Sequence, residues 1–339
     1  MKVLAVKNLT YNFDQKSICQ FDKISFDLKK GEVLTLLGPS GTGKTTLFNI
    51  LTGKLQPLSG EVEKSEGLKI EMVSGVNNLN WDLTVFENIE SHLLAHEPNA
   101  DTNRVRDMIE IFGLEYKDHK KLDQLSAGQL QRLLFARSMV VAPDVLLLDE
   151  PFSNIDEFLK ATLCHEIFEI FKENEISLVF VTHNLKEAYS LSDRIMYLSG
   201  AKLQTYQRPQ DFYDRPLSID AARFGGMINL VAGPIVERNG DKVVVKNDFG
   251  QFEVKDNLKT NNQFVYLAFR PKYLKLADDN GHLKGRVKAI IRHGEYDFVE
   301  VATMNAKVLR FQLADSSQVS VGTQVKLTID FENAFLLPV

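Results

Sequence analysis

Residues 38–45 read Gly38-Pro39-Ser40-Gly41-Thr42-Gly43-Lys44-Thr45, and Thr46 follows them. An apolar run, 33–37, precedes this segment and a helix-like stretch comes after it, which is the context of a phosphate-binding loop. In such a loop the glycines let backbone N–H groups converge on phosphates, Lys44 neutralises the β- and γ-phosphates, and the Thr45 hydroxyl can ligate Mg²⁺. The helix that follows adds its positive end. The segment therefore predicts a site for a nucleoside triphosphate, with residues 38–46 as its phosphate-binding part.

Composition sets the class of protein. The chain has 339 residues, of which 44% are hydrophobic, enough for about two domains. A net charge of −5 argues against a general nucleic-acid binder.

Polar Asn8 comes too early for a signal peptide, and no run approaches the ~18 apolar residues of a membrane span, so we expect a cytosolic chain. Cys19 and Cys164 are too far apart in sequence to indicate a disulfide framework or a zinc site.

The pattern of apolar runs and turn residues changes near residue 230. Before it, strand-like runs such as 145–148 and 178–181 alternate with helix-like stretches such as 158–171, which predicts a buried, largely parallel sheet. After it, short β runs are separated by turn residues, which predicts an all-β domain. We therefore expect a first domain over 1–228 and a second over 229–339.

Two adjacent acids, Asp149 and Glu150, end the apolar run 145–148. Ligands of α/β sheets bind at the carboxyl ends of the strands, so both side chains are expected at the triphosphate. Asp149 is suited to hold Mg²⁺, and Glu150 is suited to polarise the water that attacks the γ-phosphate. The alternative is that the two acids only cap the next helix.

Two further motifs occur in order. Residues 125–129 read Leu-Ser-Ala-Gly-Gln and come before the acids, whereas Val181-Thr182-His183 comes after them. With this order and spacing the chain resembles the ATP-binding subunits of ABC transporters. The resemblance implies an α/β P-loop NTPase fold, an ABC cassette with a helical subdomain, followed by a smaller all-β OB-like domain. It also implies that His183 is a switch histidine and that 153–156, which includes Asn154 and Asp156, is a loop at a dimer interface.

In that family two nucleotide domains pair head to tail. The resemblance implies that Ser126, Gly128 and Gln129 contact the ATP held by the partner, so that the chain forms a homodimer or pairs with a similar subunit. A helix N-terminus at Ser126 could donate to γ-phosphate oxygens, although a simple helix cap is the alternative reading. Alignment with the family also places Phe13 on the adenine, with Tyr11 as the second choice; an aromatic residue on a strand can equally be core.

Residues 269–272, Phe-Arg-Pro-Lys, resemble a segment of the OB-like regulatory (TOBE) domain of maltose, polyamine, sulfate and ferric-iron importer ATPases. The implied function is ATP hydrolysis by a cytosolic subunit that lies on the inner face of the membrane, bound to transmembrane permease subunits and through them to an external solute-binding protein. Nucleic acid is not an expected partner. The sequence does not indicate the solute. The alternatives are a soluble ABC ATPase without a transport role and a nucleotide-gated scaffold with weak hydrolysis.

The chain departs from the family at one functional position. Gly75 stands where the family has a glutamine that meets Mg²⁺ and the attacking water, and no glutamine occurs between Pro57 and Asp123. Asn77 or Asn78 are possible substitutes, although asparagines more often build turns. We expect hydrolysis to persist through Glu150 and His183 but to be slower, or to rely on the partner to order the loop.

Two smaller signals have competing interpretations. Trp81 and its apolar neighbours at 83, 85 and 86 lie where the family receives a helix of the membrane partner, so some are expected to be exposed, although core packing is the default reading. His92 and His96 share a helix face, and Glu97 is the nearby candidate for a third metal ligand. For this pair we expect two solvated histidines.

Overall fold

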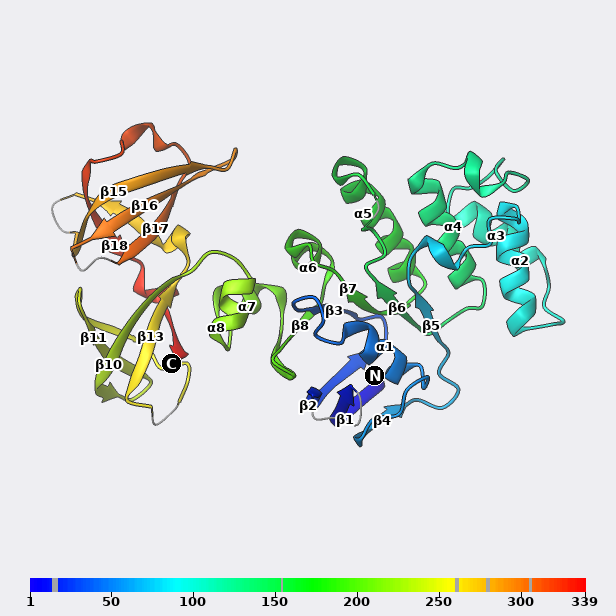
Figure 1. The fold of residues 1–339 in the computed structure, drawn as a ribbon, viewed down its shortest axis with the longest axis horizontal. Coiled ribbons are helices and arrows are strands. Elements are labelled where there is room, and N and C mark those ends of the chain that lie inside the picture. Colours follow the sequence, from blue (N-terminus) through cyan, green and yellow to red (C-terminus); the bar gives the residue numbers. More distant parts are fainter. Residues whose placement is uncertain (14–17, 154, 260–261, 279–280, 305–306) are drawn as a thin grey trace. The chain divides into compact units, whose positions relative to one another are not determined.

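The computed structural model describes residues 1–13, 18–153, 155–259, 262–278, 281–304 and 307–339, without the side chains of 13, 18, 19, 77, 157 and 158 (Figure 1). By their internal contacts these residues form two units, Met1–Pro209 and Gln210–Val339. The segment 210–228, which the sequence analysis placed in the first domain, packs with the second unit. The domain limit after residue 228 stays a prediction.

A six-stranded sheet is the centre of the first unit, in the order β5-β6-β7-β3-β8-β9. All neighbours are parallel except β9, which pairs with β8 in antiparallel fashion. Its strands are β3 (Val33–Leu37), β5 (Ile70–Val73), β6 (Val145–Asp149), β7 (Ser177–Val181), β8 (Arg194–Ser199) and β9 (Lys202–Gln207). Side chains alternate between the faces of a strand, so Leu147 packs into one core cluster while Leu146 and Leu148 pack into another. Both faces of the sheet are therefore covered, and the prediction of a buried, largely parallel sheet is confirmed.

One face is covered by a second sheet and a helix. The antiparallel order β2-β1-β4 joins β1 (Lys2–Phe13), β2 (Ile18–Lys29) and β4 (Ser59–Lys64). Helix α1 (Lys44–Leu51) leads away from the end of β3 and contributes Leu47 and Phe48, both fully buried, to the same core as Phe21 of β2. This packing fixes the start of α1 against the end of the parallel sheet.

Helices α2 (Val85–His96), α3 (Asn103–Ile111) and α4 (Ala127–Met139) pack against one another beside β5 (Figure 1). They form the helical subdomain that the resemblance implied. Capping boxes start two of them: Thr84 with Glu87 at α2, and Ser126 with Gln129 at α4. Two more helices, α5 (Glu157–Glu173) and α6 (Leu185–Leu191), follow β6 and β7.

The second unit is β-rich, as expected, after two short helices, α7 (Pro209–Asp214) and α8 (Ile219–Phe224). Its two antiparallel sheets have the orders β12-β11-β10-β13-β19 and β14-β18-β15-β16-β17 and enclose one apolar core. The strands are β10 (Asn229–Asn239), β11 (Lys242–Asn247), β12 (Gly250–Lys255), β13 (Phe264–Phe269), β14 (Leu274–Ala277), β15 (Leu283–Arg292), β16 (Asp297–Thr303), β17 (Val308–Leu313), β18 (Gln324–Ile329) and β19 (Phe335–Pro338). The fully buried guanidinium of Arg270 donates to the carbonyl oxygens of Tyr213, Ala222 and Gly226. These bonds hold the two short helices to the β-sheets.

None of the helices in the described part of the chain is both long and apolar enough to span a lipid bilayer.

Candidate functional site

The loop 38–45 connects β3 to α1, as the sequence predicted. Gly43 is the N-cap of α1 with a φ of 91°, a backbone conformation that L side chains rarely adopt. A Cβ on Gly38 would lie 2.5 Å from the carbonyl oxygen of Leu198 in β8. Glycine at these two positions lets the loop curl over the end of the sheet. The Thr42 hydroxyl donates to the carbonyl of Pro39 at 2.9 Å and closes the turn.

Lys44 is 7% exposed, and its ammonium donates to the carbonyl oxygens of Gly38 and Pro39, both at 3.0 Å. Burial lowers the pKa of Lys44 from its usual value, and the carboxylates of Glu150 and Asp149 oppose this shift. A buried ammonium is stabilised by an anion. The loop thus holds a cation at the place where the β- and γ-phosphates are expected.

Thr45 and Asp149 are 104 residues apart in sequence and in contact in the fold. The Thr45 hydroxyl donates to Asp149 Oδ2 at 2.6 Å, which joins the start of α1 to the end of β6. A hydroxyl and a carboxylate oxygen are the hard ligands that Mg²⁺ prefers, and this ion usually takes only one or two carboxylates besides phosphates and waters. These two side chains therefore fit the metal role that the sequence assigned to them.

Glu150 and His183 form a pair at the ends of β6 and β7. His183 Nε2 lies 2.6 Å from Glu150 Oε1, and both side chains are partly exposed to the cavity. The backbone of Glu150 has a φ of 49°, which is uncommon for a residue other than glycine and is typical of functional sites. Its N–H donates to the carbonyl of Val181 at 3.1 Å, so the strained residue is held by the neighbouring strand. The carboxylate and the imidazole are thus held against each other at the strand ends.

Two cavities, of about 300 and 320 Å³, meet at this pair. The first is lined by Gln20, Ser40, Gly41, Gly43, Lys44, Thr45, Thr46, Asp149, Glu150 and His183. The second extends behind Glu150 and His183 to Lys160 of α5 and Glu187 of α6. Residues of the loop, both acids and the histidine thus line the first cavity together, as expected from the order of the motifs.

A polar network supports the segment that carries His183. Lys160 Nζ lies 2.6 Å from Glu187 Oε1, and both side chains are largely buried. The other Glu187 oxygen accepts from the Thr182 hydroxyl at 2.6 Å, and Thr182 Oγ1 accepts from the backbone N–H of Asn184 at 3.0 Å. Thr182 and Asn184, on either side of His183, are therefore held by each other and by Glu187 of α6, which in turn pairs with Lys160 of α5.

Other predicted residues do not line these cavities within one chain. Ser126 and Gln129 cap α4 reciprocally, and Gly128 and Asp156 lie outside both sets of lining residues. Asp156 is exposed. Residue Asn154 and the side chain of Phe13 lie outside the described residues, so the adenine-stacking prediction stays open. Tyr11, the second choice, lies 6.4 Å from Phe21 between ring centroids and packs against the core.

Among the side chains that the structure describes, none in the loop at Gly75 takes the place of the missing glutamine. Gly75 has a φ of 78°, so a side chain at this position is strained, although a Cβ would meet no atom within 4 Å. The amide of Asn78 donates to the Ser74 hydroxyl at 3.1 Å within the same loop. The side chain of Asn77 lies outside the described residues. Asn78 therefore builds the turn, which was the ordinary reading of these asparagines.

Sequence reasoning missed two residues at the site. Gln20 of β2 lines the first cavity, beside the loop 38–45. Its amide packs so closely against Gly43 that a Cβ on this glycine would lie 2.6 Å from Gln20 Nε2. Lys160 reaches the second cavity from α5. Neither belongs to a motif, and only the folded chain brings them to the loop and to Glu187.

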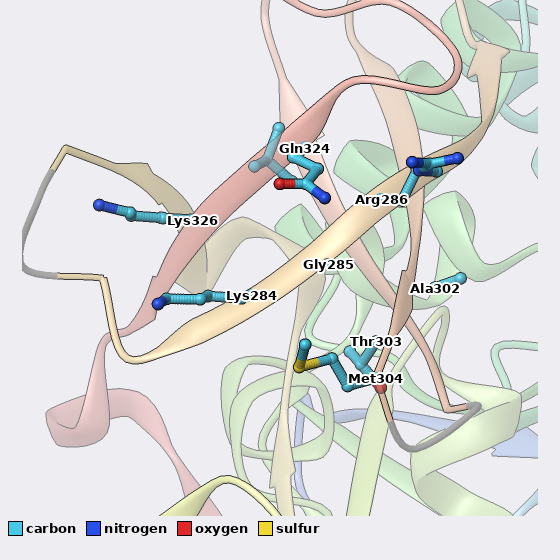
Figure 2. Close-up of a pocket in the computed structure, with 9 residues that line it drawn as sticks. Lys284, Gly285, Arg286, Ala302, Thr303, Met304, Gln324 and Lys326 are labelled. Carbon is cyan, nitrogen blue, oxygen red and sulfur yellow. The ribbon is translucent and has the colours of Figure 1, made fainter.

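The second unit has a separate cavity of about 500 Å³, formed by β15, β16 and β18 (Figure 2). Lys284 and Lys326 are cross-strand neighbours whose side chains extend toward one end, whereas Arg286 extends toward the other. The described residues that line it include no carboxylate.

Comparison with known proteins agrees with this geometry. The model of the family described as ABC transporter matches residues 21–153, and that of the TOBE domain matches residues 267–337. A spermidine/putrescine import ATP-binding protein PotA from Marinobacter nauticus is 34% identical over 301 residues, 84% of this chain and 80% of that protein. Its counterpart from Borreliella afzelii is 33% identical, covering 86% of each chain. Among solved structures, cbiO1 from Clostridium perfringens, described as part of the ABC transporter complex cbiONQ, matches with a TM-score of 0.56 and 25% identity, over 62% of this chain and 90% of that one.

Proposed function

The chain belongs to the ATP-binding proteins of ABC importers, which power solute import with ATP, and from this premise we propose that it hydrolyses ATP with Mg²⁺ at the Glu150–His183 pair. The observation that carries the proposal is the distance of 2.6 Å between these side chains, beside a buried lysine and a hydroxyl–carboxylate pair. A base within hydrogen-bond reach of the attacking water, with cations on the phosphates, is the arrangement that phosphoryl transfer needs.

Each side chain has a definite role in the proposed reaction. Lys44 binds the β- and γ-phosphates, and Thr45 with Asp149 would hold Mg²⁺, which offsets the charge of the phosphate oxygens when bound. Glu150 accepts the proton of the water that attacks the γ-phosphorus, while the bond from that phosphorus to the bridging oxygen of ADP breaks. His183 orients the Glu150 carboxylate, and the network of Thr182, Glu187 and Lys160 holds His183 in place.

We also propose that a second copy of the chain closes the site around each bound ATP. Ser126, Gly128 and Gln129 stand at the start of α4 and outside the cavity of their own chain, which supports a role toward another nucleotide. The first N–H groups of a helix favour an anion such as a γ-phosphate. A head-to-tail homodimer places this helix start of each chain on the ATP of the other.

On the membrane side, we propose permease subunits as the partners and the cytoplasmic face as the location. Trp81 is 50% exposed, whereas Val85 is fully buried, so the apolar segment divides between surface and core. An exposed tryptophan next to a helix start suits a docking contact. The relatives named above import spermidine and putrescine, which supports a polyamine as the solute to test first. A soluble ABC ATPase without a transport role is the alternative.

Whether a second chain closes the ATP site can be tested by measuring how much ATP stays with the protein. In Glu150→Gln the bound ATP should survive, so nearly stoichiometric ATP should stay with the protein through gel filtration in Mg²⁺. Adding Gly128→Asp places a negative charge at the start of α4 and should abolish retention. Gly128→Ala is the matched control, because a Cβ at this position meets only Leu163 Cδ2 at 3.9 Å. Equal retention by the Asp and Ala variants would contradict the proposed dimer.

A further inference from the structure

Glu71, His92 and His96 lie together where β5 meets α2, outside both cavities of the nucleotide site. One ring nitrogen of each histidine and one Glu71 carboxylate oxygen are all within 4.8 Å of one another. The expectation of two solvated histidines is wrong for His92, which is 8% exposed and lies against Glu71 of β5. The third group is Glu71 rather than Glu97, which instead forms ion pairs with Lys69 and Arg104.

Two contacts describe how the imidazoles of His92 and His96 lie. His92 Nε2 lies 2.7 Å from Glu71 Oε1 and has no hydrogen bond of good geometry to a described residue. His96 Nδ1 lies 3.0 Å from the carbonyl oxygen of His92. In the tautomer whose proton is on Nδ1, this contact is a hydrogen bond to the carbonyl, and Nε2 keeps its lone pair. Metal-binding histidines are commonly held by such a bond from their other ring nitrogen.

We propose that Glu71, His92 and His96 bind a divalent transition-metal ion of the zinc class. Two imidazoles and one carboxylate are a usual ligand set for zinc, with a water as the fourth ligand. Tetrahedral bonds of the usual length place donor atoms roughly 3.4 Å apart. His92 Nε2 and Glu71 Oε1, which are 2.7 Å apart, therefore have to separate slightly. The exposed side chain of His96 has to approach them by no more than about 1.4 Å, because all donor atoms lie within 4.8 Å of one another. A cavity of about 290 Å³, lined by Glu71 and His96 among others, admits the ion and its water.

Further charged groups surround the site. Glu71 also interacts electrostatically with Arg137 of α4, and Lys69, Glu97 and Arg104 form a chain of ion pairs at the rim. Once bound, the ion links β5 of the parallel sheet to α2 of the helical subdomain.

The test is calorimetric titration of the full chain with Zn²⁺, without nucleotide and in excess Mg²⁺, so that the phosphate site does not compete. One Zn²⁺ per chain is expected, and Co²⁺ in its place should show the strong visible absorption of a tetrahedral site. Glu71→Gln, His92→Gln and His96→Gln should each weaken binding about tenfold or more. His165→Gln, which changes an exposed histidine of α5, is the control and should bind as the parent does.

Absence of stoichiometric binding would overturn the site, as would equal binding by the parent and the three variants. Because His92 is buried, its replacement can disturb folding, so circular dichroism is measured for each variant. His96 is exposed, and His96→Gln decides the question if His92→Gln does not fold. Neither outcome depends on ATP hydrolysis, so the result is independent of the proposed function.

Discussion

His183 Nε2 lies 2.6 Å from Glu150 Oε1, although the two residues belong to different strand ends. The contact brings a carboxylate and an imidazole together in front of the phosphate loop. The backbone of Glu150 has a positive φ, a conformation that costs free energy. The bond from its N–H to the carbonyl oxygen of Val181 holds the residue in this conformation. The geometry therefore favours a fixed carboxylate over a mobile surface acid, which supports the proposed role of Glu150 as the base.

Glu150→Gln should abolish hydrolysis and spare ATP binding, because the amide keeps the shape of the carboxylate but cannot accept the proton of the attacking water. We expect turnover to fall by about 10²- to 10⁴-fold. Steady-state phosphate release and a binding titration with a fluorescent ATP analogue give the two quantities. Glu173→Gln, at an exposed position of α5, is the control. Retained turnover in Glu150→Gln would remove Glu150 from its proposed role.

Lys160→Met should lower kcat and leave KM for ATP nearly unchanged, because Lys160 touches Glu187 rather than the phosphate loop. Without its ammonium the Glu187 carboxylate loses its ion pair, and the segment around His183 is held less firmly. Glu187→Gln should act in the same direction. Lys172→Met, at an exposed site of the same helix, should match the parent. A selective rise in KM would indicate that Lys160 binds nucleotide instead.

Replacement of Gly75 needs a matched pair of variants, because its φ of 78° strains any side chain by about 1–3 kcal/mol. Gly75→Gln and Gly75→Ala share this cost, but only the first restores an amide. If the missing amide limits turnover, Gly75→Gln should hydrolyse ATP about 10²-fold faster than Gly75→Ala. Equal rates in the two variants would show that the gap in the motif does not slow this enzyme.

Acid should destabilise the second unit through His282. Burial lowers the pKa of His282 below its usual value of 6.5, and its Nε2 accepts the N–H of Ile329 at 3.3 Å, which requires the neutral ring. As the pH falls through 6.5, the unfolded chain takes up a proton before the folded chain does. The stabilisation is therefore present above pH 6.5 and is lost as the pH falls through the folded pKa.

Thermal unfolding at neutral and acidic pH measures this effect. The loss of Tm on acidification should be smaller in His282→Gln than in the parent, while His293→Gln, which removes an exposed histidine of the same unit, should behave as the parent. An identical pH dependence in His282→Gln and the parent would rule out this source of acid sensitivity.

The sequence predicted the parts of the site that lie at strand ends. Lys44, Asp149 and His183 each follow an apolar run, and parallel strands bring their carboxyl ends to one edge, so the contact between Thr45 and Asp149 could be anticipated without knowing the strand order. The change near residue 230 to short β runs separated by turn residues could likewise be predicted, because it depends on the local spacing of apolar side chains.

The features that were missed depend on packing between segments. Lys160 meets Glu187 only because α5 and α6 lie side by side, and no pattern within either helix reveals this contact. Helical spacing correctly placed His92 and His96 on one face. Whether that face is solvated depends on β5, whose Glu71 lies opposite His92. Gln20 reaches the phosphate loop from a strand whose sequence shows no ligand signature.

The proposed action of this ATPase on a membrane permease can be tested by purifying the tagged chain from gently solubilised membranes of its own host. Mass spectrometry should identify a polytopic membrane protein in stoichiometric amount. Trp81→Glu should release that protein and keep ATP binding, whereas Ile111→Glu, at another exposed apolar residue of the helical subdomain, should retain it. Recovery of soluble or ribosomal partners only, with no membrane protein in any sample, would contradict the account.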